Sequence, residues 1–203
     1  MKFSKYCLLI GLTLCMFSGA FAITTTYSYN FVPTPNDLSD LDHYNYFTWG
    51  INWIVPSNQV ILDAVLTISK IDDWTNESND HLYIHLLDNA PVGSKATWDN
   101  QGGGDNFAGA GPLIANYEDP GPGTANLSYR FSDLGLVNTL KSYLSNNNFG
   151  IGFDPDCHYY NCGVKLNITT QNSTPPVPEP ASLSILGMFL TGSFLSIRHK
   201  RRG

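Results

Sequence analysis

Aspartates in polar turns are the side chains of this sequence best suited to hold a cation. Asp154 and Asp156 lie in the turn after a predicted strand, and Asp99 and Asp105 lie in a glycine-rich stretch. Carboxylate oxygens are the ligands that calcium prefers. A third group lies just before the alternating stretch 47–55 and consists of Asp37, Asp40 and Asp42. No segment completes an EF-hand loop, and aspartates also form turns by hydrogen-bonding the backbone. Calcium binding and structural turns are therefore both open interpretations.

Two histidines, His81 and His85, stand four residues apart in a stretch with strand periodicity. Four residues of strand span about 13 Å, so the two imidazoles cannot both ligate one ion. The sequence also has no Gly-x-Ser-x-Gly, no His-Glu-x-x-His and no phosphate-binding glycine motif. We therefore expect a protein that is not an enzyme, and a secreted hydrolase ranks third among the function classes considered.

Aromatic residues that alternate with apolar ones suggest a sugar-binding surface. Trp49 and Trp53 share the parity of the apolar residues beside them and are predicted to lie in the core. The opposite parity carries tyrosines and histidines, which on a sheet face can stack on pyranose rings and hydrogen-bond sugar hydroxyls. The predicted glycan face consists of Tyr44, Tyr46, Tyr83, His81 and His85. The alternative is an ordinary polar sheet face, or one that a helix covers.

Apolar residues recur at every second position through most of the chain between its two ends. Strands have this period because successive side chains point to opposite faces of a sheet. The alternating stretches are 24–32, 47–55, 60–68, 82–86, 127–131, 149–153 and 164–168. One segment, 134–145, has a helical period instead, and two glycine-rich loops span 99–111 and 118–123. Residues 23–172 therefore predict an all-β fold, an antiparallel jelly-roll-like β-sandwich of about seven to eight strands with one short helix.

Residues 1–22 have the three parts of a secretory signal peptide. Lys2 and Lys5 form a basic start, an apolar stretch follows, and Ala20 and Ala22 form a small-x-small cleavage site. We therefore expect signal peptidase to cut after Ala22 and the rest of the chain to leave the cytoplasm.

Cleavage at that site removes two of the four cysteines and leaves Cys157 and Cys162. Neighbouring cysteines commonly pair in an oxidising compartment. Their bridge would close a loop of about six residues and contribute about 2 kcal/mol in the chain-entropy model. The sequence predicts this disulfide, although spacing alone does not fix the geometry that a bridge requires.

The C-terminal segment combines a Pro-Glu-Pro box, an uncharged stretch and a basic end. A short linker, 173–176, precedes it. The uncharged stretch, 181–197, would be about 26 Å long as a helix, which is the short end of a membrane span. The basic end, 198–203, favours retention of that end in the cytoplasm. The box and the basic side chains are Val177, Pro178, Glu179, Pro180, Arg198, Lys200, Arg201 and Arg202.

This order of features resembles the PEP-CTERM sorting signal of Gram-negative bacteria. In that family an exosortase, a membrane peptidase-transferase, processes the tail near the box. The resemblance covers residues 177–203 and the signal peptide, and it implies a body that crosses the inner membrane, is held there transiently by the helix 181–197, and reaches the cell surface or extracellular matrix. The stretches 37–44 and 149–163 are similar to those of PEP-CTERM proteins of unknown function.

The net charge of the region between the two end segments limits the classes of partner that it can bind. Between residues 23 and 176 there are sixteen acidic and five basic residues, a net charge of −11. Such a surface repels phosphate backbones, so nucleic acid is excluded as a partner. Tails of this family are linked with exopolysaccharide production, and the resemblance therefore favours a non-enzymatic surface or matrix protein that binds exopolysaccharide. The alternative is a structural or adhesive envelope protein with no glycan ligand.

Overall fold

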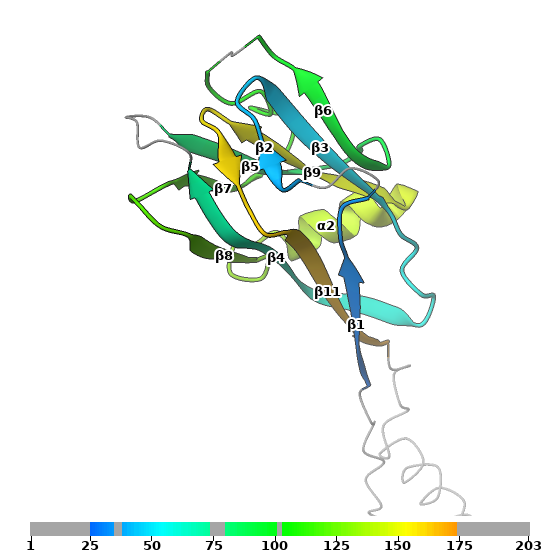
Figure 1. Ribbon diagram of the computed structural model, residues 1–203. Helices are drawn as coiled ribbons and strands as arrows, with labels where there is room; N and C mark the ends of the chain where they lie inside the picture. The colour runs from blue at the N-terminus through cyan, green and yellow to red at the C-terminus, as the bar shows by residue number, and fades with distance from the viewer. Residues whose placement is uncertain (1–24, 35–37, 74–79, 101–102, 174–203) are drawn as a thin grey trace, which may run out of the picture. The chain divides into compact units, whose positions relative to one another are not determined.

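The structure, a computed structural model, describes four ranges of the chain: 25–34, 38–73, 80–100 and 103–173 (Figure 1). Thr25–Ser173 form one compact unit. The predicted signal peptide with its cleavage site, the linker beyond Ser173 and all of 177–203 lie outside the described residues. Within the described ranges, no helix is both long and apolar enough to span a bilayer.

One sheet is built around the two longest strands. Its main strands, in order across the sheet, are β1 (Thr26–Phe31), β11 (Val164–Asn172), β4 (Gln59–Asp73) and β8 (Ala125–Arg130). The far end of β4 also pairs with β10 (Tyr159–Tyr160), which pairs in turn with β2 (Asp40–Leu41). All these pairs are antiparallel. The first and last strands of the described chain, β1 and β11, are neighbours in this sheet.

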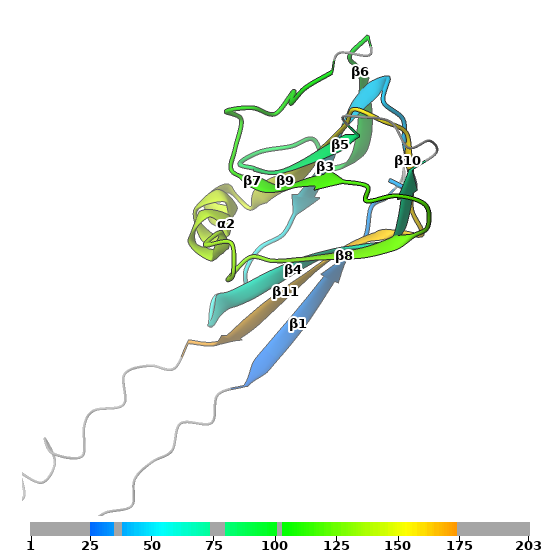
Figure 2. The ribbon, with the colours of Figure 1, turned by 90° about the vertical axis from the view of Figure 1, so that its left-hand side faces the viewer.

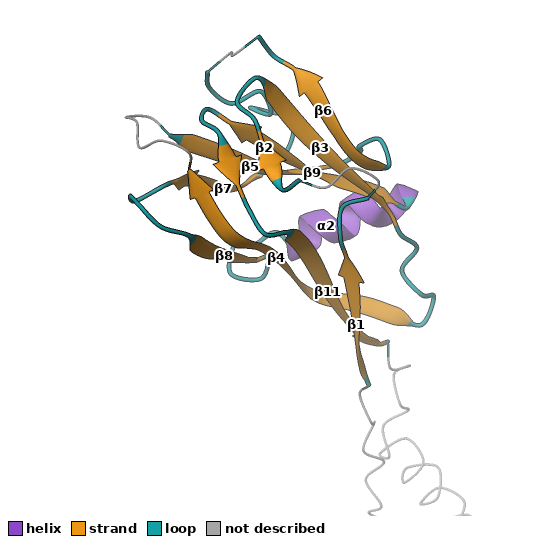
Figure 3. Cartoon of the chain, viewed as in Figure 1, coloured by secondary structure: helices purple, strands orange, loops and turns teal. Residues whose placement is uncertain are grey.

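The second sheet has five strands and is also antiparallel. Across the sheet they are β6 (Gly93–Trp98), β3 (Asn45–Asn52), β9 (Asn148–Pro155), β5 (His81–Leu87) and β7 (Leu113–Glu118). Figure 2 shows the two sheets as two layers. Strands and loops account for nearly all of the described chain, as the colours of Figure 3 show, so the prediction of an all-β, antiparallel fold is confirmed.

Side chains that alternate inward from both sheets form the core. Leu66 and Ile68 of β4, Ile84 of β5, and Phe149 and Ile151 of β9 are fully buried. Each fully buried side chain of this size stabilises the fold by about 1.5–3 kcal/mol relative to leaving it in water. The residues between them on the same strands point to the two outer faces, and the outer face of the second sheet carries most of the predicted site.

The two tryptophans predicted to be core differ in their burial. Trp49 is 2% exposed, which confirms the prediction. Trp53 is half-buried at the end of β3, and its ring packs against Tyr29 (centroids 4.9 Å apart) and Phe31 (5.7 Å) of β1. It therefore covers one edge of the core rather than filling its centre.

The helix is shorter than the predicted 134–145. Helix α2 spans Val137–Tyr143 and continues as the 3-10 turn η2, Leu144–Asn146. The helix begins only at Val137 because residues 131–136 form a turn. In this turn Gly135 has a φ of 70°, and the Leu136 N–H donates to the Phe131 carbonyl (2.8 Å). The helix contacts β4 of one sheet and β9 of the other.

The described residues contain eleven strands where about seven to eight were predicted. β2 and β10 are two residues long, too short for alternation to show. β6 lies at an edge and its last four residues are exposed, so no buried alternation marks it. In β7 the buried residues Ile114 and Tyr117 are three apart, because the pairing with β5 shifts between Ile84 and His85.

Candidate functional site

The predicted glycan face and the predicted calcium ligands meet on the outer face of the second sheet. Tyr83 on β5 pairs with Asp154 on β9, and the pairing of β9 with β3 places Tyr46 on the other side of Asp154. His81 and His85 stand on the same face as Tyr83, because the residues that alternate with them are buried inward. Four of the five predicted side chains, Tyr46, His81, Tyr83 and His85, therefore lie on one face, whereas Tyr44 does not. That this face binds a glycan stays a prediction.

A glycine-rich loop, rather than the helix, covers the centre of this face. Phe107, in the loop between β6 and β7, is only 6% exposed. Its ring meets Tyr46 edge-on (centroids 5.4 Å apart) and lies 6.0 Å from the His85 ring. Below it, a Cβ added at Gly152 would come within 2.8 Å of Phe107 Cε2. The absence of a side chain at Gly152 therefore makes room for the ring, and Phe107 fastens the loop to the sheet.

Three of the predicted calcium ligands hold this loop by hydrogen bonds. Asp154 accepts the backbone N–H (2.5 Å) and the side-chain N–H (3.3 Å) of Asn106. Asp156 accepts the Gly104 N–H (2.9 Å), and Asp99 accepts the Asn106 side chain (3.2 Å). The loop therefore folds over a cluster of carboxylates that its own amides partly neutralise.

The fourth predicted ligand, Asp105, joins the loop to His85. Its Oδ2 lies 2.9 Å from His85 Nε2, and its Oδ1 accepts the Phe107 N–H at 2.9 Å. The other ring nitrogen of His85 lies 3.0 Å from the Gly111 carbonyl. His85 is almost fully buried between these two partners, so it acts as a fastening of the loop and does not offer a ring to a ligand.

The pKa values of two carboxyl groups in this cluster, Asp154 and Asp156, are raised above their ordinary value. Asp154 is 1% exposed, and its pKa is raised to about 6. Burial is the main cause, the Asn106 hydrogen bonds oppose it, and the neighbouring Asp99 and Asp156 charges add to it. Burial also raises the pKa of Asp156. The pKa of Tyr83 is raised by burial and by the charges of Asp156, Asp105 and Asp154. The face therefore has a negative potential at neutral pH.

The carboxylates of this cluster do not form a ready-made ion cage. Their oxygens accept loop hydrogen bonds. None of Asp99, Asp105, Asp154 and Asp156 belongs to a group of three or more residues whose ligand atoms lie within 4.8 Å of one another. In the described part of the chain, two other groups meet that distance: Asp42 with His43 and His158, and Asp73 with Asp80 and Cys157. Calcium binding at the loop stays a prediction.

The predicted disulfide is not formed in the structure. Cys157 is buried and its thiol donates to Asp73 Oδ1 (3.0 Å), whereas Cys162 is exposed. Between them, Tyr159 and Tyr160 pair with β4 on one side and β2 on the other, and this extended pairing separates the two thiols. Burial raises the pKa of Cys157 to about 12, and the hydrogen bond to Asp73 acts in the same direction.

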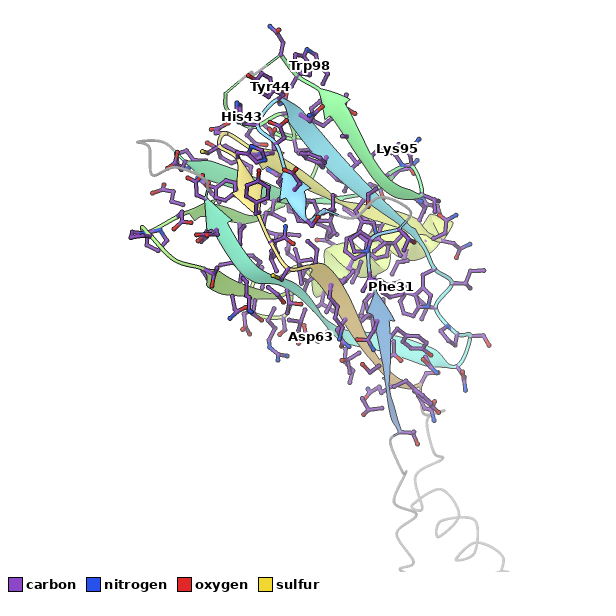
Figure 4. The ribbon with its side chains drawn as sticks, in the orientation of Figure 1. Phe31, His43, Tyr44, Asp63, Lys95 and Trp98 are labelled. Carbon is purple, nitrogen blue, oxygen red and sulfur yellow. The ribbon has the colours of Figure 1, made fainter. Side chains whose placement is uncertain are left out.

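A second surface begins where Tyr44 departs from the predicted face. Tyr44 lies just before β3; its ring stacks on Trp98 at the end of β6 (5.3 Å, 10° between planes) and on His43 (4.5 Å, 29°). Farther on, His158 stacks on Tyr160 (4.6 Å), and the His43 and His158 rings meet edge-on at 6.2 Å. We call these five residues the aromatic row, and Figure 4 shows Trp98, Tyr44 and His43 close together at one end of the domain.

The aromatic row is exposed and tied to the glycine-rich loop. Trp98 is 61% exposed and Tyr160 39%, while the three rings between them are half-buried. The Asp99 N–H donates to the Tyr44 carbonyl (3.1 Å), which joins the start of the loop to the row. The five rings therefore form one contiguous, partly exposed aromatic surface.

Comparisons with known proteins add little. No family model matches the sequence, and no curated protein matches it. A chain from the three-dimensional structure of Maize Chlorotic Mottle Virus is similar with a TM-score of 0.27 and 11% sequence identity, over 77% of this chain and 97% of that chain. A likeness at this level does not inform on function, which therefore rests on the geometry of the residues themselves.

Four members of the aromatic row were missed from the sequence. His43, Trp98, His158 and Tyr160 all stand at the ends of short or edge strands, where alternation gives no parity to assign. Their common signal was the position of an aromatic side chain next to a predicted turn: Trp98 before the glycine-rich loop, His43 before the first long strand, and His158 and Tyr160 inside the polar turn.

Proposed function

We propose that residues 25–173 form a non-enzymatic carbohydrate-binding domain that holds exopolysaccharide on the aromatic row. The observation that supports this most is Trp98: its ring is 61% exposed, yet it is held parallel to Tyr44 at 5.3 Å. A fixed, flat, amphipathic ring is the side chain that stacks on the apolar face of a pyranose with little loss of conformational freedom.

Polar groups beside the rings suit the sugar hydroxyls. Asp42 and Asp99 flank Tyr44 in space, and each is half-buried with a carboxylate that can accept hydroxyl protons. The half of the predicted glycan face under Phe107 is covered by the loop, which is why we place the ligand on the row. Tyr83 and His81 remain half-buried at the far side of the loop and are a less favourable second location.

The order of the strands supports the finer expectation of a jelly roll. Leaving out β2, β6 and β10, one sheet reads β1-β11-β4-β8 and the other β3-β9-β5-β7. This is the order that two interlocked Greek keys produce from eight consecutive strands. Jelly rolls occur in lectin domains, and that fold-level analogy agrees with sugar binding without being evidence for it.

The chain termini support delivery across the inner membrane of a Gram-negative bacterium to the cell surface or extracellular matrix. The box at 177–180, the uncharged stretch at 181–197 and the basic end would make exosortase, after signal peptidase, the processing partner. The ectodomain's excess of carboxylates agrees with a location away from nucleic acid.

Mass spectrometry of the mature protein tests this delivery. In a host with an exosortase, we expect an N-terminus at Ile23 and loss of Arg201 and Arg202 with the rest of the basic end. In a matched host without exosortase the tail should stay attached and the protein should fractionate with the membrane. Recovery of the complete tail from the host with exosortase would show that the tail is not a processed sorting signal.

Replacing Trp98 by alanine tests the glycan site. We expect at least about tenfold weaker co-sedimentation of the purified full-length protein with the producing organism's polysaccharide, since a stacked ring contributes about 1.5 kcal/mol or more. Tyr27→Ala is the control, because Tyr27 is also an exposed aromatic residue (37%) but stands on the other sheet. The melting temperature should be the same in both variants.

The same assay separates the competing interpretations. Weak binding by Tyr83→Ala with full binding by Trp98→Ala would move the ligand to the Tyr83 side of the loop. Binding that chelator abolishes would add calcium to the site and direct mutagenesis to Asp154 and Asp156. If the wild-type protein shows no saturable binding with calcium or with chelator, the structural or adhesive role without a glycan ligand becomes the better account.

A further inference from the structure

We propose that Asp42, His43 and His158 bind a divalent transition-metal ion of the zinc type. One carboxylate oxygen of Asp42 and one ring nitrogen of each histidine lie within 4.8 Å of one another. Metal–ligand bonds of about 2.0–2.2 Å place the ligands of a single zinc ion within about 3–4 Å of one another, so side-chain rotations alone close the remaining gap. This site goes beyond the proposed sugar binding: it shares Asp42, His43 and His158 with that surface, but metal binding does not require a sugar.

The site is assembled by two strands that are far apart in the sequence. Asp42 and His43 follow β2, and His158 precedes β10. Leu41 pairs with Tyr159 in an antiparallel ladder, so that the residue after Leu41 comes to lie beside the residue before Tyr159. Leu41 and Tyr159 are both fully buried, which fixes the backbone from which the three ligands extend.

Neighbouring groups hold the ligand side chains in place. Asp40 Oδ1 lies 2.5 Å from His158 Nε2, an arrangement by which a carboxylate orients an imidazole for a metal. The His43 ring is held against Tyr44 at 4.5 Å, and the Tyr44 N–H donates to Asp42 Oδ1 (3.1 Å). The carboxylates of Asp40 and Asp42 also supply two negative charges to offset those of a divalent cation.

The donor set decides the kind of ion. Two imidazole nitrogens and one carboxylate oxygen suit zinc, cobalt or nickel, whereas calcium takes oxygen ligands alone. Three protein ligands leave a fourth position for water or an external oxygen ligand. All three side chains are half-buried, so an ion can reach them from solvent. The site therefore differs in both place and chemistry from the calcium predicted at Asp154 and Asp156.

Metal titration of the purified full-length protein, without an added histidine tag, tests the site. After treatment with chelator, we expect one equivalent of zinc or cobalt to bind, and cobalt to give the intense visible absorption of a low-symmetry nitrogen–oxygen site. His43→Gln and His158→Gln should each weaken zinc binding by at least tenfold to a hundredfold, and Asp40→Asn by about tenfold. His81→Gln is the matched control. His81 is a half-buried histidine on β5, away from the proposed metal site, and its ring lies 3.0 Å from Asn116 Oδ1 of β7.

The outcomes are decisive in either direction. Loss of binding in the two histidine variants, with full binding in His81→Gln and unchanged melting of the metal-free proteins, supports the site. Equal binding by the wild type and both variants places the metal elsewhere and overturns it. The wild-type zinc titration is a second test that needs no variant: a protein that binds less than one equivalent of zinc does not have this site. Zinc binding with unimpaired polysaccharide binding would separate this site from the proposed function.

Discussion

Phe107→Ala should lower the free energy of unfolding by about 3 kcal/mol, the usual cost of truncating a buried aromatic ring. Phe107 is a loop residue, yet it is as buried as the core and contacts Tyr46, His85 and Gly152 of the sheet. Without the ring, the loop keeps its hydrogen bonds to the carboxylates but loses its apolar contact. Chemical denaturation at neutral pH measures the loss, and faster hydrogen exchange of the amides at 104–107 would locate it.

A second substitution shows whether the ring occupies the space above Gly152. Gly152→Ala places a methyl group within 2.8 Å of the ring and should displace it, at a cost of about 1–3 kcal/mol. In the Phe107→Ala background the same methyl enters vacated space, so the double variant should be clearly less destabilised than the sum of the two. Additive losses would mean that the ring does not lie over Gly152.

Asp154→Asn should remove a pH dependence from the stability of the domain. The folded-state pKa of Asp154, about 6, lies above its ordinary value of 3.8. The folded protein therefore binds a proton that the unfolded chain has released, and this contribution to stability is lost as the pH rises from about 4 to about 6. Between about pH 4 and pH 7, the free energy of unfolding of the wild type should fall by about 2–3 kcal/mol relative to that of Asp154→Asn.

The measurement is the difference between variant and wild type across the pH range. The amide introduced by Asp154→Asn can also destabilise the fold at every pH, for example through an altered contact with Asn106. Such an effect shifts the difference in unfolding free energy equally at all pH values and leaves its pH dependence unchanged. Asp88→Asn is the matched control, because Asp88 is an exposed aspartate directly after β5. Parallel stability curves for wild type and Asp154→Asn would show that the carboxyl is not buried in solution.

Alternation predicted the parts of the fold that depend on burial against a second sheet. β4, β5, β9 and β11 each place every second residue in the core, and their central residues were assigned from sequence. The strands that were missed obey other rules. β6 is stabilised by pairing with β3 at the edge. β10 pairs with the far end of β4, and β2 pairs in turn with β10. Backbone pairing of this kind leaves no periodic mark on side chains.

The residues of the candidate site also divide into those that the sequence predicted and those that it did not. The parity of β5 placed His81, Tyr83 and His85 on one outer face, and the density of aspartates marked Asp154 and Asp156. Sequence could not show that Phe107 would cover that face, because a loop has no period from which to predict docking. Nor could it bring His43 beside His158, since their proximity depends on the two-residue pairing of β2 with β10.

The neighbouring positions of β1 and β11 also decide how this domain would bear mechanical load. The Asn172 N–H donates to the Thr25 carbonyl (3.1 Å), so the described chain enters and leaves at one end, while Trp98, Tyr44 and His43 lie at the opposite end (Figures 1 and 4). A polymer bound there would pull against a C-terminal attachment along β11. The hydrogen bonds of β11 to both β1 and β4 would then share the force in shear instead of opening one at a time. This pairing would therefore resist tension applied between the two opposite ends of the domain.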